Sequence, residues 1–230
     1  MRTTLLFACF TLFSTAIASA STCIPGGTLS SYIALGSTGC TVGNTLFNDF
    51  ETLAIPFGAT QIDPATVTIT PIAGSFDQTL QFNIGAFVNN GNFSDVDIGF
   101  HATAAPNLLA GSQVQLIAPS FTGDGSVTAI HDACPNGSFD PGLTCSTSDV
   151  NAIVTDTSAL TDLLEGTAFA PAKTAAFFTD IGLDPGLSGT ASVRAVSVTV
   201  NSIPEPAELG FLSGAGAALV LLSRLRRGRN

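Results

Sequence analysis

Tryptophan is absent from the 230-residue chain, tyrosine and methionine each occur once, and only 10% of the residues are charged. Five of the seven lysines and arginines stand near the two ends: Arg2, Arg224, Arg226, Arg227 and Arg229. Between Ser21 and Ile203 only Lys173 and Arg194 oppose fifteen acidic residues, a formal net charge of −13. Because phosphate contacts need Lys and Arg, nucleic-acid binding is disfavoured, and so is attraction to anionic lipid. The balance favours a solvated acidic surface, with divalent cations as the alternative partner.

The N-terminus has the three parts of a secretory signal peptide. Arg2 supplies a positive charge, an apolar region runs from Leu5 to Ala18, and Ala18-Ser19-Ala20 is a small-residue cleavage site. We predict that residues 1–20 are removed, leaving Ser21 first. Lipoprotein processing at Cys23 is the alternative, although the usual leucine three residues before the cysteine and the small residue directly before it are missing.

The C-terminal segment, residues 202–230, also has three parts. Pro204-Glu205-Pro206 precedes the uncharged run Leu209 to Ser223, and the arginine cluster follows. As a helix this run would span roughly 22 Å at about 1.5 Å per residue, less than the roughly 30 Å of a bilayer core. Snorkelling arginines can extend it, and the positive-inside rule would keep them cytoplasmic. A single-span anchor and a core helix with a basic end are the alternatives.

The order of these three parts resembles the PEP-CTERM domain, the bacterial C-terminal sorting signal associated with exosortase. The resemblance implies an exosortase-type processing enzyme as partner, an inner-membrane intermediate and a final place at the cell surface or in the extracellular matrix. It also implies exopolysaccharide in the surroundings. The segment from Cys23 to Phe50 resembles the N-terminal region of a group of exported PEP-CTERM proteins. The sorting residues that the resemblance implies are Pro204, Glu205, Pro206, Arg224, Arg226 and Arg227.

The remaining segment, residues 21–201, has the length of one domain with its own core. It is rich in Thr, Ser, Gly, Val, Ile and Phe and nearly free of Lys, Arg and Glu. Helices usually draw on Lys, Glu, Arg and Leu, so this composition indicates strands. We therefore predict an all-β domain, a β-sandwich of the jelly-roll or Ig-like type. The one helical candidate is Ala159–Leu164, with Asp156 and Thr157 as caps.

Alternation of apolar and polar residues locates the strands. The segment from Ser30 to Leu35 is expected to be a short strand or turn, and Asn90-Gly91 predicts a hairpin turn within 89–92. Pro135 to Thr144 is expected to be a loop. The predicted strands are 47–56, as an edge strand, and 66–70, 80–84, 95–100, 112–119, 126–131, 151–155, 175–179 and 192–200.

Four cysteines remain after signal removal: Cys23, Cys40, Cys134 and Cys145. An even number in an exported chain indicates disulfides, for which three connectivities are open. We favour the local pairs Cys23–Cys40 and Cys134–Cys145, each closing a loop rich in Gly or Pro. No zinc spacing is present. The run His131 to Cys134 is interpreted as a turn-bound histidine beside a disulfide.

Two carboxylates, Asp95 and Asp97, stand two residues apart on a predicted strand and would share its solvent face. With Asn89, Asn90 or Asn92 they could hold Ca²⁺, which takes six to eight oxygen ligands. The stretch does not match an EF-hand loop, and a solvated acidic strand face is the alternative.

No catalytic motif stands out. The sequence contains no Gly-x-Ser-x-Gly and no His-Glu-x-x-His. The seventeen phenylalanines are interpreted as the core, because a sugar-binding surface generally uses Trp and Tyr. We therefore expect an exported, non-enzymatic envelope or matrix protein. A Ca²⁺-dependent carbohydrate-binding module and a secreted hydrolase are the alternatives.

Overall fold

The computed structural model describes residues 20–53, 59–89 and 91–205. The predicted signal peptide except Ala20, and Pro206 with the apolar run and arginine cluster, lie outside these ranges. Within them, no helix is long and apolar enough to cross a membrane. Strand pairing stops at Ile203, directly before Pro204, which has no backbone N–H to donate. Glu205 then approaches Lys173, with 3.9 Å between Oε1 and Nζ.

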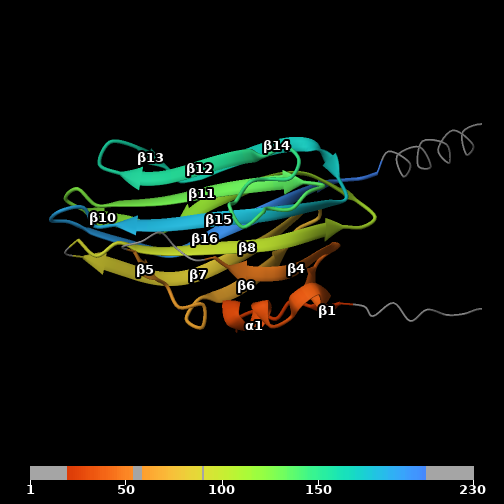
Figure 1. Ribbon diagram of the computed structural model, residues 1–230, viewed down its shortest axis with the longest axis horizontal. Coiled ribbons are helices and arrows are strands. Elements are labelled where there is room, and N and C mark those ends of the chain that lie inside the picture. The colour runs from red at the N-terminus through yellow and green to blue at the C-terminus, as the bar shows by residue number, and fades with distance from the viewer. Residues whose placement is uncertain (1–19, 54–58, 90, 206–230) are drawn as a thin grey trace, which may run out of the picture.

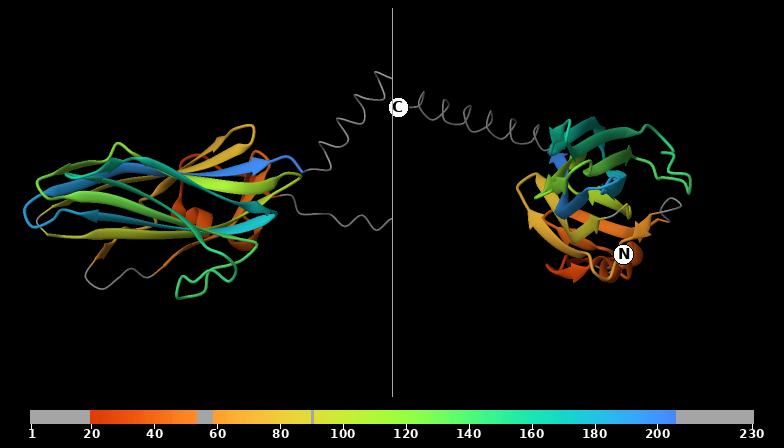
Figure 2. Two further views of the ribbon diagram at one scale, coloured as in Figure 1. Left: turned by 90° about the horizontal axis from the view of Figure 1, so that it is seen from above. Right: turned by 90° about the vertical axis from the view of Figure 1, so that its left-hand side faces the viewer.

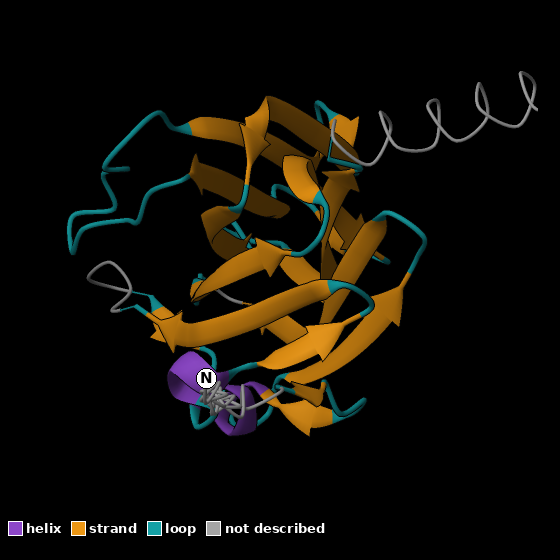
Figure 3. Cartoon of the chain, turned by 90° about the vertical axis from the view of Figure 1, so that its right-hand side faces the viewer, coloured by secondary structure: helices purple, strands orange, loops and turns teal. Residues whose placement is uncertain are grey.

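Strands make up most of the described chain and helices only two short segments (Figure 3), as the composition predicts. Ten of them have six residues or more. In chain order the elements are β1 (Ser21–Thr22), β2 (Gly27–Thr28), α1 (Leu29–Ile33), η1 (Gly36–Thr38), β3 (Cys40–Val42), β4 (Thr45–Thr52), β5 (Thr60–Gln61), β6 (Thr68–Ala73), β7 (Asp77–Asn89), β8 (Ser94–Ala104), β9 (Leu108–Ile117), β10 (Ser120–Thr122), β11 (Ser126–Pro135), β12 (Val150–Thr157), β13 (Thr161–Asp162), β14 (Leu164–Ala172), β15 (Thr174–Asp184) and β16 (Thr190–Ile203).

The strands form two sheets packed face to face (Figures 1 and 2). The nine-stranded sheet has the order β1-β3-β4-β8-β15-β11-β12-β13, with β5 beside β8. The seven-stranded sheet has the order β14-β9-β16-β7-β6-β2, with β10 beside β16. The predicted β-sandwich is confirmed. The first described strand and the end of β16 lie at the same end of the sandwich.

Phenylalanines fill the middle of the core. Phe100 packs against Phe47, Phe50, Phe82 and Phe177, with ring centroids 5.3–6.3 Å apart. These rings come from both sheets, so they join the two layers. The predicted alternation is confirmed in β7 and β8, whose buried core residues include Leu80, Phe82, Ile84, Val96, Ile98 and Phe100.

Two local predictions are wrong. Leu29–Ile33 is a helix, because Thr28 Oγ1 accepts the Ser31 N–H as an N-cap and the buried Leu29 and Tyr32 are three residues apart on one face. Residues 159–164 contain no helix. There Thr157 Oγ1 accepts the N–H groups of Ala159 and Leu160 and closes a turn, and the chain then returns as β13 and β14.

The long-range pairing differs from the prediction at two further places. The turn at Gly91 is no hairpin, because β7 and β8 belong to different sheets. The segment predicted as an edge strand, β4, lies between β3 and β8. Both errors concern which strands become neighbours, and a local residue pattern carries no information about that.

Both predicted disulfides are confirmed. Cys23–Cys40 and Cys134–Cys145 have Cα atoms 4.8 and 5.5 Å apart. Cys23, the alternative site of lipoprotein processing, is therefore paired with Cys40 in the structure. Two disulfides in a domain of this size indicate an oxidising, extracytoplasmic compartment.

Candidate functional site

The outer face of the nine-stranded sheet carries a row of four direct neighbours. Glu51 on β4, Gly99 on β8, Phe178 on β15 and Asp132 on β11 follow one another across the strands. Val96, Ile98 and Phe100 point into the core, so side chains at alternate positions of β8 point outward. Gly99 leaves room for Glu51, since a Cβ at Gly99 would lie 2.8 Å from Glu51 Cγ. The glutamate side chain therefore lies across β8.

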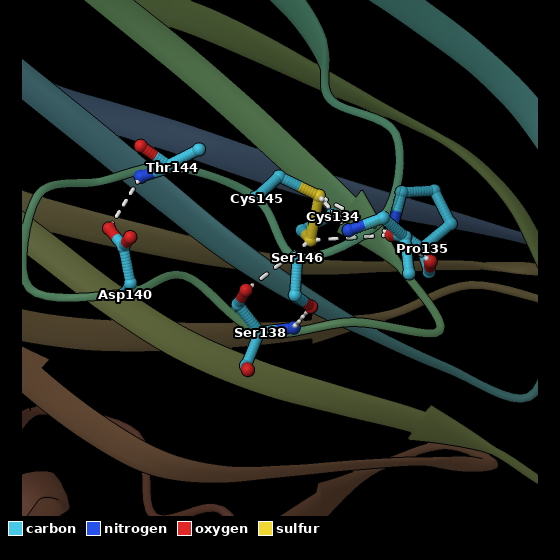
Figure 4. The surroundings of a disulfide bond; sticks show 8 residues. Cys134, Pro135, Ser138, Asp140, Thr144, Cys145 and Ser146 are labelled. Atoms are coloured by element: carbon cyan, nitrogen blue, oxygen red, sulfur yellow. Dashed lines mark hydrogen bonds between the residues drawn. A yellow bond between two sulfur atoms is a disulfide. The ribbon is translucent and has the colours of Figure 1, made fainter.

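The loop between Cys134 and Cys145 covers part of this face. Phe139, from the loop, lies over Phe178 with ring centroids 6.4 Å apart. Asp140 Oδ1 accepts the N–H groups of Gly142 and Thr144 at 2.8 and 2.9 Å. Ser138 and Ser146 are joined by two hydrogen bonds of 3.0 Å (Figure 4). These bonds and the disulfide fix the loop from inside.

A pocket of about 210 Å³ lies between the loop and the sheet. Phe139 provides aromatic surface over Phe178, which is only 5% exposed, and Gly99 lies in the floor beneath the Glu51 side chain. Glu51 and Asp140 bring carboxylates to the wall. Because Asp140 already accepts two backbone N–H groups through one oxygen, Glu51 is the more available hydrogen-bond acceptor. The pocket therefore combines apolar rings with an acidic acceptor, and the Cys134–Cys145 loop is one of its walls.

Next to the pocket, three carboxylates converge. Asp97 and Asp180 are direct neighbours on β8 and β15, and Asp95 stands two residues before Asp97. One ligand oxygen of each lies within 4.8 Å of the others. Phe93 reaches over this end of the sheet, since a Cβ at Gly182, opposite Asp95, would lie 3.3 Å from its ring. Asp95 and Asp97 are only 2% and 5% exposed.

Burial and mutual repulsion raise the pKa of these groups. Loss of solvation, then the charges of Asp180 and Asp97, and then a side-chain hydrogen bond with Asp180 raise the pKa of Asp95 to about 7. Loss of solvation and then the charge of Asp180 raise the pKa of Asp97 to about 6. Asp132, farther along the face, has its pKa raised to about 6 by burial, Asp149 and Asp180. The ionised forms are therefore poorly stabilised by the described protein groups.

The structure brings together two of the residues that the sequence analysis grouped. Asp95 and Asp97 do share a face, but that face is covered, so the expected solvent exposure is wrong. Their partner is Asp180, which the sequence analysis missed. Asn89 belongs to the other sheet, and its backbone carbonyl accepts a hydrogen bond from the side-chain amide of Asn92. Asn90 lies outside the described residues.

His131 is also placed differently from the prediction. It lies within β11 and is fully buried, with Nδ1 2.9 Å from Thr179 Oγ1 and Nε2 3.0 Å from Ser112 Oγ. Its ring stacks on Phe177. Burial lowers the pKa of His131 to about 4. Because Ser112 belongs to β9, His131 is a polar link between the two sheets, and it lies on the opposite side of the nine-stranded sheet from the pocket.

Known proteins show only weak similarity to this chain. The chain matches no protein-family model and no curated protein. Among solved structures, TmCBM61 in complex with β-1,4-galactotriose is 8% identical, with 65% of this chain and 86% of that one covered and a TM-score of 0.28. The family 32 CBM from C. perfringens NanJ in complex with galactose is 9% identical, covering 76% and 98%, with a TM-score of 0.23.

A third likeness is to the Gap123 glycosylation-associated protein complex from Streptococcus agalactiae. It is 12% identical over 71% of this chain and 27% of that one, with a TM-score of 0.29. Likenesses at such low identities and TM-scores assign no function to this chain.

Proposed function

We propose that this chain is an exported, non-enzymatic protein of the bacterial cell envelope or extracellular matrix that binds neutral polysaccharide. The single observation that carries the proposal is the preformed pocket between the Cys134–Cys145 loop and the nine-stranded sheet. Two disulfides support an extracytoplasmic location. The PEP-CTERM resemblance of residues 202–230 supports sorting by an exosortase-type system from an inner-membrane intermediate.

The chemistry of the pocket favours a sugar without charge. Phe139 offers apolar ring surface above the buried Phe178, and an ionised carboxylate such as that of Glu51 accepts hydrogen bonds but donates none. Sugar hydroxyls supply the matching donors. An anionic sugar would meet Glu51, Asp140 and a domain of formal charge −13, which disfavours it. Neutral hexose units are therefore the best match.

The size and rigidity of the pocket fit one sugar unit of a polysaccharide. The pocket holds about 210 Å³, whereas pockets for drug-sized ligands hold roughly 300–1,000 Å³. The disulfide and the loop hydrogen bonds fix the wall before binding, which lowers the entropic cost of association. Weak single-site binding is compatible with a polysaccharide, because each polymer chain presents many identical units to the pocket.

Strand order supports the jelly-roll alternative over the Ig-like one. The order β8-β15-β11-β12 faces the order β7-β16-β9-β14, and successive strands cross repeatedly between the sheets. This is the arrangement of two Greek keys in an eight-stranded jelly roll, an architecture that lectin domains also use. Fold alone does not decide function, so this is support only for the architecture.

Affinity electrophoresis of the exported protein tests the proposal. We expect migration to be retarded in gels containing neutral galactan or xylan, but not in gels containing acidic polygalacturonate. Phe139→Ala should abolish the retardation, because the ring forms the pocket roof. Phe87→Ala is the matched control, since Phe87 is 61% exposed on β7 of the other sheet. Equal retardation of both variants would contradict the assigned pocket, and release of reducing ends would contradict the non-enzymatic assignment.

A further inference from the structure

We propose that Asp95, Asp97 and Asp180 bind one divalent cation, with calcium as the ion that fits best. This proposal does not depend on carbohydrate binding, because it concerns a separate set of side chains. One oxygen from each of the three carboxylates lies within 4.8 Å of the others, and the strand register of β8 and β15 holds them together.

Unpartnered buried oxygens are the second observation that points to a ligand. Asp95 Oδ1 and Asp97 Oδ1 are buried and have no hydrogen-bond partner among the described residues. The residues Asp95 and Asp97 are themselves more than nine-tenths buried, with exposed fractions of 2% and 5%. Buried polar atoms in folded proteins are almost always paired, and an unpaired pair of carboxylate oxygens calls for an explanation. A cation between the carboxylates would satisfy both.

Neutralising charge from the protein is missing in the described part of the chain. Its only lysine and arginine are Lys173 and Arg194. Lys173 lies between β14 and β15, approaches Glu205 and is 75% exposed at its side chain. Arg194 is exposed on β16 of the other sheet. Asp132 and Glu51 add further acidic groups on the same face.

The ligand atoms favour a hard cation. All three are carboxylate oxygens, and the cluster contains no histidine or cysteine. Zinc and the later transition metals prefer nitrogen and sulfur ligands, whereas calcium takes six to eight oxygens in flexible geometry. Magnesium needs near-ideal octahedral geometry and loses water reluctantly. Three converging carboxylates, completed by water or by a ligand hydroxyl, suit calcium.

The position gives the cation a structural role beside the pocket. Asp97 is two residues from Gly99 along β8, and Asp180 is two residues from Phe178 along β15, a separation of about 7 Å along each strand. Gly99 and Phe178 both line the pocket. A bound ion would therefore tie together the two strands that form the pocket floor.

Calcium titration of the metal-free exported protein tests the site. Thermal unfolding and titration calorimetry measure the response. At a calcium concentration about 100 times Kd we expect Tm to rise by about 5–10 °C, with one binding site. Asp97→Asn and Asp180→Asn should remove the response, while Asp49→Asn, an exposed carboxylate on β4, should keep it. Magnesium at the same concentration should give a smaller rise.

Two results would overturn the proposal. The first is that neither the Tm nor the calorimetric trace of the wild-type protein responds to calcium. This test requires no variant. The second is a calcium response that persists in folded Asp97→Asn and Asp180→Asn proteins. An equal response to magnesium would overturn the assignment to calcium. Loss of calcium binding with galactan retardation intact would leave the proposed function standing, so the two proposals fail separately.

Discussion

Asp97 on β8 lies directly opposite Asp180 on β15, and its Oδ1 atom is buried without a described hydrogen-bond partner. Like charges at directly opposed cross-strand positions destabilise a sheet. The pair is also within reach of Asp95, whose Oδ1 atom is equally unpartnered. The arrangement lowers the stability of the metal-free protein at neutral pH, and this cost fits a site that is completed by a ligand.

Removing one of these charges should therefore stabilise the metal-free protein. In the presence of a chelator and at about pH 8, above the raised pKa values, we expect Asp97→Asn to increase the free energy of unfolding by about 1–3 kcal/mol. Asp49→Asn should change it by less than about 0.5 kcal/mol, as surface substitutions usually do. Urea unfolding measures both. Destabilisation by Asp97→Asn would show that the carboxylate is satisfied by the protein itself.

The two disulfides should separate stability from binding. Each closes a loop of a size that contributes about 3 kcal/mol, so replacing either pair with serines should lower Tm by roughly 6–12 °C. Only the Cys134→Ser/Cys145→Ser protein should lose retardation in galactan, because only that loop carries Phe139. Thermal unfolding and affinity electrophoresis of the two double variants give the comparison. If only the Cys23→Ser/Cys40→Ser protein lost binding, the binding site would have to lie away from the Cys134–Cys145 loop.

His131 should make the protein sensitive to acid. Its pKa is about 4 in the folded protein and about 6.5 when unfolded, so the unfolded chain takes up the proton first as the pH falls. Stability should be unaffected by this group above about pH 6.5. It should fall by about 3 kcal/mol between pH 6.5 and 4.

Comparison with His131→Gln isolates this effect from the carboxylates. Glutamine can still bond to Ser112 and Thr179 but takes up no proton in this range. The difference in unfolding free energy between wild type and variant should shrink as the pH falls from 6.5 to 4. A constant difference would mean that His131 is not kept neutral by burial.

Local patterns predicted the strands well because alternation depends on nearby residues. Val96, Ile98 and Phe100 reach the core as predicted, and the turn-rich spacing of the cysteines led to the correct disulfides. The same pattern placed Asp95 and Asp97 on the outer face. It could not reveal that this face is covered, because alternation shows which face a side chain lies on but not what packs over that face.

The missing partner Asp180 shows the same limit. It meets Asp97 only because β15 inserts between β8 and β11, a pairing that no residue near Asp97 specifies. The predicted helix at 159–164 failed for a different reason. A Thr that can cap a helix can equally close a turn, and the following β13 residues pair with β12.

The sorting tail is predicted to be removed near Pro204-Glu205-Pro206. Proline limits its own φ and biases the preceding residue toward extended backbone, which keeps the segment accessible to an enzyme. Intact-mass measurement of protein from an exosortase-positive host should show loss of the segment that follows. Replacing the three residues with alanine should leave the tail attached and the protein in the inner membrane. If the tail were removed from that variant as from the wild type, Pro204-Glu205-Pro206 would be a linker and not a sorting motif.

The central claim is that the outer face of the nine-stranded sheet binds neutral polysaccharide, and amide chemical-shift mapping tests it most directly. Neutral galacto-oligosaccharides would be titrated into the isotope-labelled exported protein. We expect the shifts to concentrate at Glu51, Gly99, Phe139 and Phe178, the pocket residues. Saturating oligosaccharide that moves no amide, or moves only those on the outer face of the seven-stranded sheet such as Gln81 and Gln115, would contradict the account.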